Sequence, residues 1–380
     1  MKAAYDAIVV GVGGMGSAVA YHLAKRGQRV LGLERFDIPH AMGSSHGVSR
    51  IIRLAYFEHP SYVPLLRRAY ELWRELEREA GEQLLYITGG IDAGPPDSRS
   101  VRGSLLSCQT HGISHEVLTG DQVNRRFPAY QLPASFAAVY QPDGGFVASE
   151  RAIVAHVAGA RSLGAEIHVR ERVLAWEPCG EGVVVETDQG RYEAGRLVIC
   201  AGVWAGSLVP ELAGKVVAER QVVAWLQPTE PTLFQPDRFP IFVLEVSPEE
   251  RIYGFPIFSV PGFKLGLFHH FHEQTTGDTV DREWHPRDEA ALRRLAETYF
   301  PKGAGATLSM SACMFENSPD EHFIIDTLKS APQVTVAAGF SGHGYKFCGV
   351  VGEIMADLAI QGRTPHDISL FGLDRFTQPV

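Results

Sequence analysis

The feature that most constrains this chain is a glycine-rich turn between an expected strand and an expected helix near the N-terminus. Residues 5–10 (Tyr-Asp-Ala-Ile-Val-Val) form a short apolar run that is typical of a buried parallel strand. Residues 16–27 carry apolar side chains at helical spacing and end at a glycine, and residues 29–34 form a second apolar strand. The pattern predicts a strand–helix–strand unit with a right-handed crossover.

The turn itself, residues 11–16, reads Gly-Val-Gly-Gly-Met-Gly, which is the G-x-G-x-x-G pattern of dinucleotide-binding proteins. Its first glycine allows the tight turn, its second lets the backbone approach a pyrophosphate, and its third lets helix and strand pack closely. Free N–H groups at the helix start favour an anion there. Glu34 ends the second strand about 20 residues on, where an acid accepts the ribose hydroxyls. The pattern predicts a dinucleotide site but does not distinguish FAD from NAD.

Composition excludes several classes of protein. The net charge of −9 gives no reason to expect a nucleic acid as partner. There is no apolar run near the roughly 18 residues of a membrane helix, no secretory signal, and no targeting signal in the tail Thr-Gln-Pro-Val, so we expect a cytoplasmic protein. The five cysteines are odd in number and scattered, which argues against a disulfide framework and a zinc site. No metal is expected.

The order of elements predicts an α/β (α+β) protein with two interleaved domains. Helices are expected at 62–80, 151–163 and 350–360, whereas residues 216–271 are mostly β. We expect a Rossmann-type dinucleotide-binding domain made of residues 1–85, 146–215 and 311–380. A β-rich substrate domain is expected to comprise residues 86–145 and 216–310.

Four further segments resemble the family of monomeric sarcosine oxidases and N-methyltryptophan oxidases. They are 43–53 (Gly-Ser-Ser-His-Gly-Val-Ser-Arg-Ile-Ile-Arg), 310–315 (Met-Ser-Ala-Cys-Met-Phe), 318–326 (Ser-Pro-Asp-Glu-His-Phe-Ile-Ile-Asp) and 338–347 (Ala-Gly-Phe-Ser-Gly-His-Gly-Tyr-Lys-Phe). The resemblance covers essentially the whole chain. It implies a fold like that of glycine oxidase and D-amino acid oxidase, FAD as cofactor, and a monomer. It also implies oxidative demethylation of sarcosine or a related N-alkyl amino acid by O2, giving the primary amino acid, formaldehyde and hydrogen peroxide.

The resemblance also implies roles for individual residues. Cys313 carries FAD covalently, as a thioether through the 8α-methyl carbon of the ring (8α-S-cysteinyl). Lys264 lies beside the flavin, where its charge stabilises superoxide forming from O2, and Arg50 also lies near the ring. Further cofactor contacts are implied for Gly11, Gly13, Gly14, Met15, Gly16, Glu34, Arg35, Ser44, His46, Val173, Ala201, Gly202, Trp204, Gly342, His343, Gly344 and Lys346.

Three residues are expected to bind the substrate. By resemblance Arg53 and Lys346 bind its carboxylate, and a guanidinium suits this task because its planar fork donates two parallel hydrogen bonds. If residues 50–53 are helical, Arg50 and Arg53 share one face. Tyr253 matches a tyrosine of the substrate pocket.

Two departures from the family concern the pocket. The family places a catalytic histidine shortly after the lysine strand, and here His269 and His270 are both candidates because the resemblance to the family implies a one-residue insertion. Phe315 stands where sarcosine oxidases have a tyrosine. The loss of this hydroxyl predicts a roomier or more apolar pocket, which accepts bulkier N-substituted glycines along with sarcosine.

Other functions fit parts of the pattern. A glycine, D-amino acid or pipecolate-type FAD oxidase shares the fingerprint and the fold, and differs in its amine and in whether the flavin is covalent. A flavin dehydrogenase with another electron acceptor is less favoured, and a nicotinamide-dependent one would need a second G-x-G-x-x-G, which the chain lacks. A non-enzymatic flavin-binding module leaves Arg53, Lys264 and Lys346 without a role.

Overall fold

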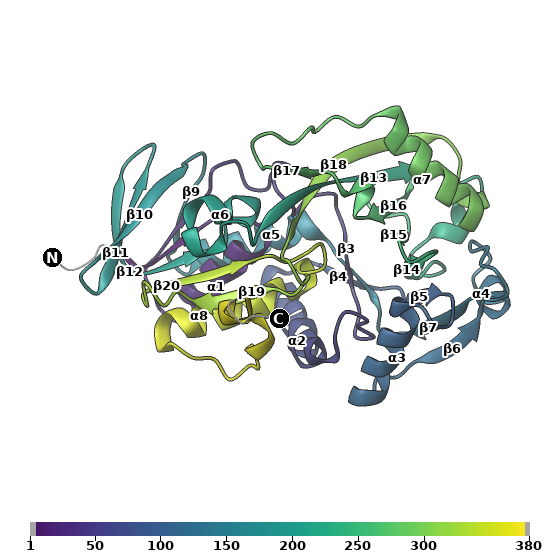
Figure 1. Ribbon diagram of the computed structural model, residues 1–380, viewed down its shortest axis with the longest axis horizontal. Helices are drawn as coiled ribbons and strands as arrows, with labels where there is room; N and C mark the ends of the chain where they lie inside the picture. Colours follow the sequence, from purple (N-terminus) through teal and green to yellow (C-terminus); the bar gives the residue numbers. More distant parts are fainter. Residues whose placement is uncertain (1–4, 377–380) are drawn as a thin grey trace.

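The computed structural model describes residues 5–376, so the outer ends of the expected first domain, 1–4 and 377–380, lie outside it together with the tail discussed above. Two large sheets lie toward opposite ends of the long axis of the molecule, with a small three-stranded sheet near the middle (Figure 1). Within the described part, no helix combines the length and the apolar character needed to cross a membrane.

The first sheet has a parallel centre. β1 (Tyr5–Val10) pairs in parallel with β2 (Val30–Leu33) and β12 (Arg191–Ile199), which confirms the predicted strand–helix–strand unit. Parallel pairing continues from β2 to β9 (Glu166–His168) and from β12 to β20 (Val334–Ala338). Antiparallel strands extend the sheet beyond β12: β11 (Gly182–Thr187) and then β10 (Val173–Cys179) follow the start of β12, and β19 (Ile324–Thr327) pairs with β20.

Four helices pack beside this sheet: α1 (Gly14–Lys25), α2 (Val63–Ala80), α5 (Ser149–Ser162) and α8 (Cys348–Gln361). α1 contacts both α5 and α8, and its face toward them is buried alanine, valine and leucine. α2 ends at Gly81, whose φ of 65° is left-handed and therefore suits glycine. All four match helices expected from apolar side chains at helical spacing.

The second sheet is largely antiparallel and has nine strands. β13 (Val217–Leu226) pairs with β16 (Phe263–Phe268) and with β18 (Thr307–Asn317), and the ladder runs on through β15 (Arg251–Phe255) and β14 (Ile241–Glu245). It continues through β5 (Gly90–Gly94), β7 (Ala137–Gln141) and β6 (Glu116–Thr119). β18 forms the opposite edge, and β17 (Gln274–Thr275) pairs with the start of β13 on the side of β16. The helices nearest to it are α3 (Arg99–His111), α4 (Gly120–Arg126) and α7 (Pro286–Tyr299). β18 crosses the boundary expected at residues 310 and 311 (Figure 1).

The small sheet consists of β3 (Arg50–Ile52), β8 (Gly145–Val147) and β4 (Leu85–Ile87). The segment that carries Arg50 and Arg53 is therefore extended, and the condition under which both would share a helical face is not met. Arg53 follows the last residue of β3, so the alternation of side chains along a strand does not fix its direction relative to Arg50. Each arginine has its own set of partners.

Candidate active site

Two adjoining cavities share Met15, Ser44, Ser45, Glu316 and Phe340 on their walls. The first, of about 240 Å³, lies at the glycine turn and is called the turn cavity. The second, of about 140 Å³, is called the pocket and is lined largely by the second sheet and the small sheet. The two cavities therefore lie next to each other.

The glycine turn has the geometry that its sequence predicts. Gly11 has a φ of 83°, and a Cβ on it would lie 2.5 Å from the carbonyl oxygen of Cys200. A Cβ on Gly16 would lie 1.7 Å from the carbonyl oxygen of Gly11, so Gly16 is required for packing and is not itself on the cavity wall. The start of α1 has no side-chain cap and no acid in its first turn. This leaves backbone N–H groups and the positive end of the helix dipole for an anion.

Glu34 is buried at the end of β2 and fixed by the backbone. Its carboxylate accepts hydrogen bonds from the N–H groups of Val12 (2.8 Å) and Phe36 (3.0 Å). Most of the other residues expected to bind the dinucleotide lie on the same wall. The expected residues that line the turn cavity are Gly11, Gly13, Gly14, Met15, Glu34, Arg35, Ser44, Val173, Ala201, Gly202 and Trp204.

Arg53 is the most deeply buried cation of the pocket, with 3% of its surface exposed. Its Nε lies 3.2 Å from Asp92 and its Nη2 lies 3.1 Å from Glu58, whereas its Nη1 is buried with no hydrogen-bond partner. Burial lowers the pKa of Arg53, but Asp92 and Glu58 more than offset this and raise it. The side chain is thus a fixed cation with one free donor, which suits a carboxylate ligand.

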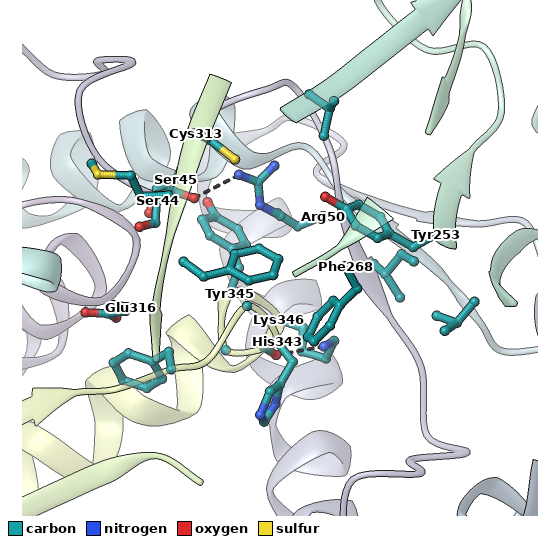
Figure 2. A pocket seen from close by; sticks show the side chains of 18 of the residues that line it. Ser44, Ser45, Arg50, Tyr253, Phe268, Cys313, Glu316, His343, Tyr345 and Lys346 are labelled. Atoms are coloured by element: carbon teal, nitrogen blue, oxygen red, sulfur yellow. Dashed lines mark hydrogen bonds between the residues drawn. The ribbon is translucent and has the colours of Figure 1, made fainter. Parts of the chain in front are cut away.

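Lys346 lies close to Arg53. Its Nζ donates to the carbonyl oxygen of His343 at 2.7 Å (Figure 2) and lies 5.1 Å from the ring centre of Tyr56. The guanidinium carbon of Arg53 lies 4.7 Å from the same ring centre. Burial, and then the charge of Arg53, lower the pKa of Lys346 to about 7. Glu58 stays ionised among these cations, since burial raises its pKa but Arg53, His343 and Lys346 lower it to about 2.

Cys313 and Arg50 lie together at the opposite end of the pocket (Figure 2). Arg50 donates to the carbonyl oxygens of Ser44 at 2.8 Å and Ser49 at 3.0 Å. Cys313 is buried, and this burial raises the pKa of its thiol. The charges of Arg50 and Lys264 oppose the rise but do not cancel it. His46, Gly342 and Gly344 also line the pocket, as the resemblance implies for residues near the cofactor.

Lys264 lies behind this end of the pocket and does not line it. Its Nζ donates to the carbonyl oxygens of Gly47 (2.6 Å) and Ser49 (3.0 Å), and it lies 4.4 Å from the ring centre of Phe255. Burial, and then the charge of Arg50, lower its pKa well below the usual value. The lysine is a fully buried group of β16, which lies between β13 and β15 in the interior of the second sheet.

The structure places neither expected histidine on the pocket wall, where Phe268 stands instead. β16 ends at Phe268, and the chain then turns through a left-handed conformation at His269, with φ of 58°. This turn carries both histidine side chains away from the pocket. The pocket therefore has an apolar ring at this point, in place of the histidine that the resemblance implies.

Both histidines are held by carboxylates elsewhere. His269 bridges Glu219 (2.8 Å) and Glu321 (3.1 Å); burial lowers its pKa, but these two hydrogen bonds raise it to about 9. His270 hydrogen-bonds Asp288 at 2.8 Å. Glu219, His269 and His272 bring three potential ligand atoms within 4.8 Å of one another, but both ring nitrogens of His269 already have partners.

Several pocket residues were not predicted from the sequence. Tyr253 was expected, and Arg251 precedes it by two residues on the same strand, so the two-residue period of a strand would have placed both side chains on one face. Glu58 follows Arg53 closely in a loop, where no period applies. Glu316 is buried in β18 and lines both cavities (Figure 2). Burial raises its pKa to about 8, and its Oε2 has no partner.

Comparison with known proteins agrees with this geometry. Residues 6–358 match the model of the DAO family, described as FAD dependent oxidoreductase. The monomeric sarcosine oxidase of Streptomyces avermitilis is 45% identical over 376 residues, which is 98% of this chain and 97% of that protein. The N-methyl-L-tryptophan oxidase of Citrobacter koseri is 36% identical, over 98% of this chain and 100% of that protein. A glycine oxidase structure from Geobacillus kaustophilus has the same fold, with a TM-score of 0.82 at 21% identity over 98% of each chain.

These matches confirm the expected fold class and the family suggested by the sequence. The match to the family model spans nearly the whole chain. The two oxidases are 45% and 36% identical to this chain over almost their full lengths. The chain belongs to the DAO family of FAD dependent oxidoreductases, in the group that contains the monomeric sarcosine oxidases and N-methyl-L-tryptophan oxidases.

Proposed function

We propose that the protein oxidises sarcosine or a related N-alkyl amino acid, releasing the primary amino acid, an aldehyde (formaldehyde for N-methyl substrates) and hydrogen peroxide. The observation that carries the proposal is the unpaired Nη1 of Arg53, which is buried beside Lys346 in a pocket that adjoins the dinucleotide cradle. A buried donor without a partner is costly, so a carboxylate ligand would recover that cost. The names of the two similar oxidases support the same substrate class.

The residues present fit FAD. The uncapped start of α1 suits the pyrophosphate, Glu34 suits a ribose, and the unpaired Oε2 of Glu316 lies where the two cavities meet. When bound, the flavin supplies the acceptor for the two electrons removed from the amine. We infer that the glycine turn holds the pyrophosphate, and that the wall around Cys313 and Arg50 holds the ring.

The pocket residues would bind and orient the amine. Arg53 and Lys346 bind the carboxylate, and Glu58 fixes the guanidinium of Arg53 in place. The rings of Phe268 and Phe315, with centres 5.0 Å apart, exclude water from the reacting end. Nearby cations also lower the pKa of the substrate amine, and the neutral amine is the form whose lone pair supports oxidation.

The covalent attachment of FAD to Cys313 is part of the proposal. Acid denaturation of the purified protein should leave flavin absorbance in the pellet, and Cys313→Ala should release it to the supernatant. Cys108→Ala is the matched control, because Cys108 is equally buried but lies in α3, away from both cavities. Complete release of flavin from the native protein would refute the covalent bond while leaving an FAD oxidase possible.

The substrate class is tested by steady-state kinetics with detection of hydrogen peroxide and formaldehyde. Sarcosine and N-methyl-L-alanine should be oxidised, whereas N-methylethylamine, which lacks the carboxylate, should lose at least about tenfold in kcat/KM because a charge-assisted hydrogen bond is absent. Activity on glycine or a D-amino acid alone would overturn N-demethylation. We further propose that Lys264 acts in the reaction with O2, so Lys264→Met should slow reoxidation by O2 more than reduction by substrate.

We also propose that the two large sheets are the cores of two interleaved domains and that the protein works as a monomer. The separate hydrophobic clusters of the two sheets support two domains, with β18 assigned through Asn317 to the second. The word monomeric in the names of the similar sarcosine oxidases supports the second point, and sedimentation would test it. The cytoplasmic location stays a prediction.

A further inference from the structure

Arg251 is a cation of the pocket. The proposed binding of the substrate carboxylate by Arg53 and Lys346 gives it no role. It begins β15 and lies opposite Phe268 across the β15–β16 ladder. Its guanidinium carbon lies 4.8 Å from the ring centre of Phe57 and 5.4 Å from that of Phe268, and all three residues line the pocket. The side chain is only 16% exposed, so its charge is directed into the pocket and not into bulk solvent.

The protein does not neutralise this charge closely. The nearest ion-pair partner is Glu245, at 3.8 Å from Nη2, and the Nε of Arg251 is buried with no partner. The carboxylate of Glu245 already accepts hydrogen bonds from the backbone N–H groups of Arg99 (3.1 Å) and Ser100 (2.8 Å) and from the Ser100 hydroxyl (2.7 Å). Glu245 thus caps the start of α3, and Arg251 keeps donors for another anion.

Arg251 and Arg53 are placed to bind two parts of one small molecule. The guanidinium carbon of Arg53 lies 4.6 Å from the ring centre of Phe57, the same ring that Arg251 approaches to 4.8 Å. The guanidinium carbons of Arg251 and Arg53 therefore lie no farther apart than the sum of their two distances to this ring centre. Such a span suits two carboxylates that are joined by a few carbon atoms, with one carboxylate at each arginine.

We propose that Arg251 binds a second carboxylate of the substrate, so that N-alkyl derivatives of dicarboxylic amino acids are the preferred substrates. This inference rests on the proposed function and specifies which side chain of the substrate the pocket selects. Phe57 and Phe268 would cover the methylene groups between the two carboxylates. Arg251 is thereby assigned as a specificity-determining residue and Arg53 as the site of the α-carboxylate.

The direct test compares N-methyl-L-glutamate with N-methyl-L-glutamine, which have nearly the same shape but differ by one charge. The native protein should prefer the acid in kcat/KM by about tenfold or more, the value of one charge-assisted hydrogen bond. Arg251→Met keeps an apolar stem against the two rings; it should abolish the preference by raising KM for the acid at least about tenfold more than KM for the amide. Arg251→Lys should keep part of the preference. Arg99→Met is the matched control, because Arg99 is a neighbouring cation that is half exposed and does not line the pocket.

The result that overturns the inference is equal kcat/KM for the acid and the amide, or a loss in Arg251→Met that is the same for all substrates. Calorimetric binding of glutarate and of its monoamide separates this failure from a failure of the proposed function. If the protein oxidises none of these amines but binds glutarate about tenfold more tightly, and only while Arg251 is present, the second carboxylate site stands and the reaction is wrong. Equal binding of the two ligands overturns the site.

Discussion

Gly342 lies on the pocket wall with a left-handed backbone, and its replacement by alanine should be costly for two separable reasons. Its φ is 74°, and a Cβ would lie 2.5 Å from Cε2 of Phe315 and 2.7 Å from two further atoms of that ring. Gly362, at the end of α8, has a similar φ of 69°, but a Cβ there meets nothing within 4 Å. Gly362→Ala is therefore a control for the backbone cost alone.

The expected magnitudes follow from these contacts. A left-handed alanine costs about 1–2 kcal/mol at either position, and overpacking of a buried ring adds about 1–3 kcal/mol at Gly342 alone. The free energy of unfolding should thus fall by about 1–2 kcal/mol in Gly362→Ala and by about 2–5 kcal/mol in Gly342→Ala. If Phe315 causes the difference, Gly342→Ala should cost no more than Gly362→Ala when both are introduced into a Phe315→Ala background.

Urea denaturation followed by tryptophan fluorescence would measure all of these variants, and the double-mutant cycle isolates the contact between the two residues. Flavin absorbance of the purified variants gives an independent reading, because the clash lies at the pocket wall. Equal losses in the two glycine variants, or an unchanged cost of Gly342→Ala without Phe315, would refute the reasoning. In that case the cofactor, and not Phe315, would require glycine here.

Three further predictions concern ionisable groups. Binding of methoxyacetate, a carboxylate without an amine, should weaken from about pH 6 to about pH 8 as Lys346 loses its proton, and Lys346→Met should flatten this profile in calorimetric titrations. Burial raises the folded-state pKa of Glu316 to about 8, above its unfolded value, so its contribution to stability is complete below about pH 4 and is lost as pH rises through 8. In cofactor-free protein, Glu316→Gln should remove this part of the dependence of the free energy of unfolding on pH. An unchanged pH dependence would contradict the assignment. Burial raises the pKa of Asp288, but Arg220 and the neighbouring hydrogen bonds lower it further, so its stabilisation is present above about pH 4 and is lost as pH falls. Asp288→Asn leaves the buried Arg220 with Glu273, at 3.3 Å, as its remaining carboxylate partner and should lower the free energy of unfolding by about 3 kcal/mol at neutral pH, whereas a loss near zero in denaturation curves would exclude a stabilising pair.

Local periodicity predicted the cradle well because both of its elements are regular. The apolar run of β1 and the helical spacing of α1 determine where the glycine turn lies, and Glu34 follows from the length of β2. The same approach could not place Arg50 and Arg53 relative to each other. Three residues of strand carry too little pattern to exclude a helix, and the pairing of β3 with β8 depends on a segment about 95 residues away.

The end of β16 shows a second limit of sequence reasoning. His269 and His270 are the residue types expected for the pocket, but the left-handed turn after Phe268 decides which side chain faces it. That turn depends on carboxylates from distant segments, Glu219 and Asp288, which hold the two histidines. Arg251, in contrast, could have been predicted from its two-residue spacing to Tyr253.

The packing of α8 against α1 has a consequence for the order of events during synthesis. α1 begins at the glycine turn, and Gly352 of α8 approaches it so closely that a Cβ would lie 2.7 Å from the backbone of Ala18. Residues 17–347 separate the turn from the helix that supports it, so the ribosome releases the turn well before α8. Chains emerge N-terminus first, at about 5–20 residues per second. The nucleotide cradle is therefore incomplete until α8 has been made, and cofactor loading is expected to follow the synthesis of this helix.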